Sequence, residues 1–82
     1  MMDRAEAAII ERYAEALQFS LAYFPSTDVN FDRRIRDELW DAGTEIERRG
    51  LAKTSQYDEA VLRADRIARE IRTKQAASMQ HA

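Results

Sequence analysis

Apolar residues recur every three or four positions along most of this chain, a spacing that is typical of amphipathic helices. The clearest series lies between Phe31 and Leu51, where five apolar side chains share one helical face: Phe31, Ile35, Leu39, Ala42 and Ile46. The series stops at Gly50, because glycine readily adopts the left-handed conformation that ends many helices. These features predict a helix over about residues 30–49.

Polar residues mark both ends of this predicted helix. Asn30, in preference to Asp28, is expected to cap the first turn, since such side chains accept hydrogen bonds from free backbone N–H groups. Two arginines precede Gly50, and their charge suits the negative end of the helix dipole. Beyond the glycine, Leu51 is expected to fold back onto Ile46, as in a Schellman motif.

A first helix is predicted over about residues 3–24. Asp3 and Glu6 form an Asp-x-x-Glu sequence that resembles a capping box. Pro25 disfavours helical geometry in the residue before it, so the helix should end near Tyr23 or Phe24. Its apolar face comprises Ile9, Ile10, Tyr13, Ala14, Leu17, Ser20, Leu21 and Phe24.

A third helix is predicted over about residues 55–75, opened by Thr54 or Ser55. Its apolar face comprises Tyr57, Ala60, Val61, Ala64, Ile67, Ala68 and Ile71. The apolar pattern fades after Lys74, so residues 76–82 are expected to form a frayed tail.

Three amphipathic helices with short connections must pack together to bury their apolar faces. We therefore expect an all-α fold, a small antiparallel three-helix bundle in which residues 1–82 form a single domain. Only about 60% of the unfolded surface is expected to be buried in a chain of this size, so homodimerisation is one way to complete the core.

The composition excludes several classes of protein. The 82 residues include no cysteine, so there is no disulfide framework or thiolate metal site and nothing indicates secretion. The longest charge-free stretch, residues 16–27, is too short to span a bilayer. We therefore expect a cytoplasmic protein without a membrane segment or a signal segment.

Several large side chains lie off the three apolar faces. Trp40 is about 100° from Leu39 around its helix, Phe19 and Tyr23 are one turn apart, and Leu62 is opposite the apolar face of the third helix. Aromatic residues and arginine often dominate binding energy at interfaces. The candidate interface residues are therefore Phe19, Tyr23, Trp40, Leu62, Arg36, Arg66 and Arg69.

The same residues also have a purely structural interpretation. Phe19 and Tyr23 would then be sandwiched between the second and third helices, Trp40 would close one end of the core, and Leu62 would be an ordinary exposed leucine. Gly43 adds a further hint, because a mid-helix glycine costs about 1 kcal/mol relative to alanine and suggests a close helix crossing.

Catalytic motifs are absent from the sequence. The one histidine, His81, lies in the expected tail, so no Ser-His-Asp triad or Glu-x-x-His metal site can be assembled. Glu38, Asp41 and Glu45 share a helix face, but their spacing from Arg34 and Arg49 indicates a surface lattice of ion pairs. We expect neither an enzyme nor a metal or cofactor site.

Nucleic-acid binding is a weaker alternative. Arg63, Arg66, Arg69 and Arg72 recur every three residues in the third helix, and a three-residue step drifts about 60° per repeat around a helix. The arginines therefore wrap around the helix instead of forming one strip, and carboxylates between them would repel phosphate. The net charge of −2 also argues against a general polyanion binder.

The sequence thus favours a non-catalytic helical protein-interaction domain. Such a domain could be a small regulator or inhibitor that docks on a larger protein, or it could self-associate as a homodimer. The alternative is a small nucleic-acid-binding regulator that uses the arginine-rich third helix, although we consider nucleic acid an unlikely partner.

Overall fold

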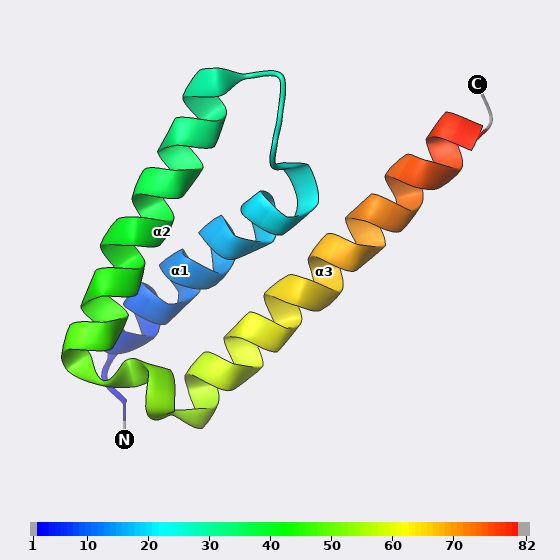
Figure 1. Ribbon diagram of the computed structural model, residues 1–82. Helices are drawn as coiled ribbons and strands as arrows, with labels where there is room; N and C mark the ends of the chain where they lie inside the picture. The colour runs from blue at the N-terminus through cyan, green and yellow to red at the C-terminus, as the bar shows by residue number, and fades with distance from the viewer. Residues whose placement is uncertain (1, 81–82) are drawn as a thin grey trace.

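The computed structural model describes residues 2–80, which form three α-helices joined by short connections (Figure 1). The elements are α1 (Arg4–Tyr23), α2 (Val29–Arg49), the 3-10 turn η1 (Leu51–Lys53) and α3 (Ser55–Gln80). The chain runs along α1, returns along α2 and then runs along α3 in the direction of α1. The predicted all-α antiparallel three-helix bundle is confirmed.

The start of α1 is a capping box, as the sequence predicts. The Glu6 backbone N–H donates to Asp3 Oδ1 at 2.8 Å, and the Asp3 N–H donates to Glu6 Oε1 at 3.5 Å. At the other end, the Phe24 N–H donates to the Ser20 carbonyl at 3.0 Å. Helix geometry stops there because Phe24, which precedes Pro25, is extended with φ −83° and ψ 138°.

The start of α2 differs from the preferred prediction. Asp28, not Asn30, caps the helix, because its carboxylate accepts from the backbone N–H groups of Asn30 at 3.0 Å and Phe31 at 3.1 Å. The preceding loop holds Asp28 in place, since the Ser26 hydroxyl accepts from the Asp28 N–H at 3.1 Å and donates to the Asp32 carboxylate at 2.7 Å. Asn30 therefore lies within the first turn of the helix.

The end of α2 lies at a left-handed Gly50, as predicted, but the cap is not the expected Schellman motif. Gly50 has a φ of +69°, and its N–H donates to the carbonyls of Ile46 and Glu47. The bond to Ile46 is the one that defines the simpler left-handed cap, and the same N–H is shared with Glu47. Ile46 and Leu51 are both buried in the same apolar cluster, so the leucine beyond the cap does fold back onto the core.

The cap of α3 by Thr54 agrees with the prediction, whereas the connection before it and the length of α3 depart from it. The segment after Gly50 forms the η1 turn, and Thr54 Oγ1 then accepts from the Tyr57 N–H at 3.2 Å to cap α3. The helix continues to Gln80, so a frayed tail from residue 76 is wrong as far as the structure describes the chain. The residues after Lys74 have no apolar face with which to pack against the bundle. They are nevertheless helical, because alanine, glutamine and lysine are good helix formers. His81 lies outside the described residues.

The helix α1 is the centre of the bundle. It packs against both α2 and α3, whereas α2 and α3 have little direct contact in the described chain. Figure 1 shows these two helices meeting near η1 and diverging away from it. One side of α1 is therefore left only partly covered between them.

Small residues make the closest helix contacts. The central cluster comprises Ile10, Ala14, Ile46, Leu51, Ala60 and Ala64. Ala60, Ala64 and Ala68 repeat every four residues on α3 and are each 2% exposed, so α1 can approach α3 closely along this row. No large side chain in the described chain is less than 2% exposed. The larger apolar residues instead lie at the margins of the core.

Candidate interaction surface

Trp40 projects from α2 into solvent. Its relative exposure is 76%, which excludes the interpretation that it closes one end of the core. The surrounding hollow spans α1 and α2 and is called here the Trp40 surface; it is lined by Tyr13, Leu17, Arg36, Leu39, Trp40, Gly43, Thr44 and Glu47. An exposed tryptophan beside half-buried leucines and a tyrosine is a typical composition for the centre of a protein interface.

The Trp40 surface continues toward the start of α3. An adjoining hollow shares Tyr13, Gly43 and Glu47 with it and extends to Lys53 and Tyr57. The rings of Tyr13 and Tyr57 are tilted at 33°, with their centroids 6.0 Å apart. Tyr13 thus lines both hollows, which are together called here the apolar groove and extend from α2 to Tyr57 at the start of α3.

Burial changes the acidity of one of these phenols. The pKa of Tyr57 is raised, first because burial disfavours its charged form and then because Tyr13 and Asp58 are nearby. Both the raised pKa and the apolar neighbours favour a neutral hydroxyl near pH 7. At Tyr57 the groove therefore offers a phenol that donates or accepts hydrogen bonds without carrying charge.

Gly43 lies in the middle of this groove. A Cβ atom built on Gly43 would be 3.4 Å from Cε1 of Tyr13, a separation close to ordinary van der Waals contact. The expected close crossing is therefore an approach of a tyrosine ring and not of a helix backbone. Contact with α1 alone leaves space for a methyl group at this position.

Charged residues occupy the opposite side of α1. At 100° per residue, Glu11 and Arg12 lie on the side of the helix opposite Tyr13 and Leu17. Arg12 Nε donates to Glu38 Oε2 of α2 at 2.6 Å, and Arg63 of α3 contacts both carboxylate oxygens of Glu11 at 2.6 Å. The two sides of α1 thus differ: one has ion pairs to its neighbours and the other has the apolar groove.

The aromatic candidates of α1 lie on the ion-paired side. Phe19 stacks on Tyr23 with ring centroids 6.2 Å apart and meets the edge of Phe31 at 6.3 Å. Phe19 and Phe31 line a hollow together with Arg12. The Phe19 side chain is thus half-buried against α2 and is not sandwiched between α2 and α3. Tyr23 lies beside it and is 38% exposed.

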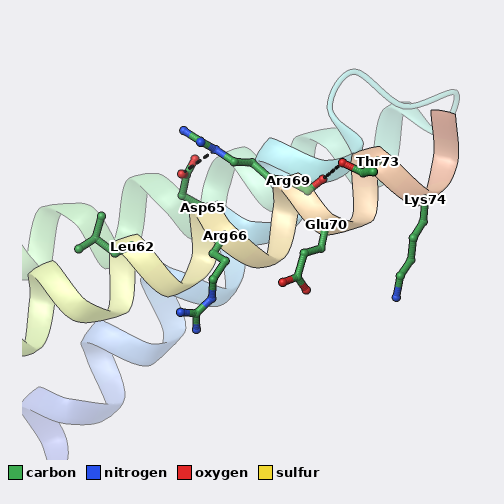
Figure 2. Close-up of a pocket in the computed structure, with 7 residues that line it drawn as sticks. All are labelled: Leu62, Asp65, Arg66, Arg69, Glu70, Thr73 and Lys74. Atoms are coloured by element: carbon green, nitrogen blue, oxygen red, sulfur yellow. Dashed lines mark hydrogen bonds and ion pairs between the residues drawn. The ribbon is translucent and has the colours of Figure 1, made fainter. Parts of the chain in front are cut away.

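The remaining candidates lie on the outer side of α3. Leu62 is 68% exposed, and Figure 2 shows it on the same helix as Arg66 and Arg69, whose side chains project toward opposite edges of the helix. Arg69 Nε is 3.0 Å from Asp65 Oδ2, an ion pair also drawn in Figure 2. All the residues that line this hollow belong to α3, so no second element encloses it.

The structure therefore separates the seven candidates into three groups, and only Arg36 and Trp40 lie together on the Trp40 surface. Tyr13, Leu17 and Leu39 also belong to that surface, although their positions on the apolar faces of their helices predicted them in the core. The sequence does indicate the α2 part of the surface, since Arg36, Trp40, Gly43 and Glu47 are spaced four, three and four apart, but it does not indicate which residues of α1 lie beside them. That spacing places them in one stripe along α2.

The carboxylates of α2 form ion pairs, although with partly different partners from those expected. Glu45 pairs with Arg48 and, at 3.2 Å, with Arg49, and the second of these pairs was predicted. Glu38 pairs with Arg12 of α1 instead of Arg34. Hydrogen bonds from these arginines hold the pKa values of Glu38 and Glu45 below their usual range.

Other kinds of site find no support in the part of the chain that is described. Residues 2–80 contain no group of three or more potential ligand side chains placed to hold a metal ion. No helix in that range has both the length and the apolarity needed to cross a bilayer. Comparison of the chain with protein-family models, curated proteins and solved structures gave no match.

Proposed function

We propose that this chain is a non-catalytic protein-interaction domain that binds its partner through the Trp40 surface. The observation that carries the proposal is the 76% exposure of Trp40 at the edge of a groove lined by other apolar side chains. Exposing a large apolar patch to water is unfavourable, and such patches on small soluble domains commonly mark interaction sites. A cytoplasmic regulator or inhibitor that docks on another protein would use the domain in this way.

The chemistry around Trp40 suits protein recognition. Tryptophan and tyrosine bury large areas with few rotatable bonds, and arginine forms directional contacts at the rim of an interface. Arg36 and Glu47 flank Trp40 on the same stripe of α2. The surface thus has an apolar centre between charges of opposite sign, which favours a partner with a matching centre and rim.

Nucleic acid is a less suitable partner. Two of the four arginines on α3 are occupied, since Arg63 pairs with Glu11 and Arg69 pairs with Asp65. Phosphate would have to displace these carboxylates, and the displaced groups would remain nearby as repulsive charges. The protein-interaction proposal requires no such rearrangement.

Site-specific photo-cross-linking in cells that produce the chain tests this proposal. Trp40 is replaced by the photoreactive residue p-benzoylphenylalanine, and the matched control carries the same residue at Glu15, an exposed position on the ion-paired side of α1. We expect irradiation to give a discrete cross-linked protein product from position 40 and none from position 15. The absence of any product at position 40, or the same products at both positions, would contradict the proposal.

A further inference from the structure

We propose that the partner on the Trp40 surface is a second copy of this chain, bound through an antiparallel pair of α2 helices. The choice of surface rests on the proposed function, whereas the identity of the occupant rests on the pattern of residues along α2. A symmetric dimer requires a surface that is complementary to itself. The stripe of Arg36, Trp40, Gly43 and Glu47 has this property.

The size pattern of the stripe is self-complementary. When two α2 helices run antiparallel about a twofold axis level with the junction of Asp41 and Ala42, Trp40 of one copy lies opposite Gly43 of the other. The largest side chain of the stripe thus meets the residue that has none. This pairing also gives Gly43 a role, because contact with Tyr13 alone would leave room for a methyl group.

The charge pattern is self-complementary about the same axis. Arg36 and Glu47 are as far from the junction of Asp41 and Ala42 as each other, so Arg36 of each copy lies opposite Glu47 of the other. Within residues 2–80, neither side chain forms an ion pair inside its own chain. A parallel pair would instead place like charges opposite one another, which is unfavourable. The charges therefore select the antiparallel arrangement.

The exposed area of the single chain is large enough for such a dimer. The chain exposes 6292 Å², whereas a compact monomer of 9.5 kDa is expected to expose about 5,000 Å². Part of the excess lies on the end of α3, where residues 72–78 are exposed. The total excess of about 1,300 Å² is larger than the roughly 800 Å² that each partner buries in an interface of standard size.

Measurement of mass by sedimentation equilibrium over a wide concentration range tests the presence of the dimer. We expect a dimer that dissociates on dilution, and a blue shift of tryptophan fluorescence as the dimer forms, since Trp40 is the one tryptophan of the chain. Leu62→Ala, a change of an exposed leucine on α3, serves as the matched control and should leave the dissociation constant unchanged. At about millimolar protein, all but the weakest dimers would be detected. A chain that is still monomeric at that concentration overturns the proposal.

Charge exchange tests the register of the two helices. Arg36→Glu alone and Glu47→Arg alone should each weaken the dimer, because each places like charges opposite one another. The double variant restores opposite charges and should recover most of the lost affinity. Weakening in both single variants without recovery in the double variant overturns the antiparallel register.

Gly43→Ala separates folding from association. The added methyl group fits beside Tyr13 and raises helix propensity, so the dilute monomer should melt at the same temperature or higher. In the dimer it fills the space opposite Trp40, and we expect an increase in dissociation constant of about tenfold or more, as for loss of a central interface contact. Unchanged association in this variant contradicts the pairing of Trp40 with Gly43.

The outcomes distinguish this proposal from the proposed function. A monomeric chain that still gives a cross-link from position 40 to a different protein refutes the second copy as the partner and retains the interaction surface. A chain that neither dimerises nor gives a cross-link from that position refutes both.

Discussion

Replacing Trp40 by alanine should leave the monomer folded, and the expected loss can be worked out from its exposure. The side chain is 76% exposed, so folding buries about a quarter of an area of roughly 250 Å². At about 25 cal/mol per Å², the buried part contributes at most about 1.5 kcal/mol. The better helix propensity of alanine offsets a few tenths of that loss.

A buried residue of the same region provides the comparison. Leu51 is 3% exposed, and truncation of a buried leucine to alanine costs about 2 to 5 kcal/mol. For a domain of this size, 1 kcal/mol corresponds to roughly 4 to 8 °C in melting temperature. We therefore expect Trp40→Ala to lower the melting temperature by less than about 10 °C and Leu51→Ala to lower it by more.

The assay is thermal and urea unfolding followed by circular dichroism, at a protein concentration where the measured mass is that of a monomer. Working below the dimer dissociation constant matters because association stabilises the folded state by mass action. If Trp40→Ala costs about as much as the 3 to 5 kcal/mol typical of a core tryptophan, Trp40 is packed inside the protein. The interaction surface would then lose its main support.

Three further predictions concern other parts of the chain. Gly50→Val should destabilise the protein by about 1 to 2 kcal/mol, because a β-branched residue is strained at the observed φ of +69°; an unchanged urea midpoint would show that this cap is unimportant. Duplex DNA should show no salt-dependent binding at micromolar protein, and a salt slope that Arg66→Ala with Arg69→Ala reduces would instead favour nucleic-acid recognition. The pKa of Glu38 is lower in the folded chain than its usual value of 4.5, so its ionised carboxylate stabilises the folded state at higher pH. Stability should therefore fall as the pH drops below about 4.5 and Glu38 becomes protonated. Melting temperatures measured from pH 7 to pH 2 should show a smaller fall in Glu38→Gln, and an identical fall would mean that this carboxylate contributes nothing.

The sequence by itself determined the ends of the helices that depend on local hydrogen bonds. The Asp3 and Glu6 capping box and the Gly50 cap each involve partners within about one turn of the helix. Such contacts form in nearly the same way whatever the rest of the chain does, and residue identity therefore predicts them. The cap of α2 was mispredicted, although its contacts are equally local, because aspartate and asparagine are both favourable caps and the bond from the Asp28 N–H to Ser26 Oγ favours Asp28.

Only the tertiary structure decided which large side chains are exposed together. Periodicity places Phe19, Trp40 and Leu62 off the apolar faces of their own helices, but it does not give the rotation of one helix relative to another. The alanine row of α3 packs against α1 and turns Leu62 outward, while the Arg12 and Glu38 pair lies on the side of α1 where Phe19 is found. Trp40 is left beside Tyr13 and Leu17, because contacts between residues far apart in the sequence orient the helices.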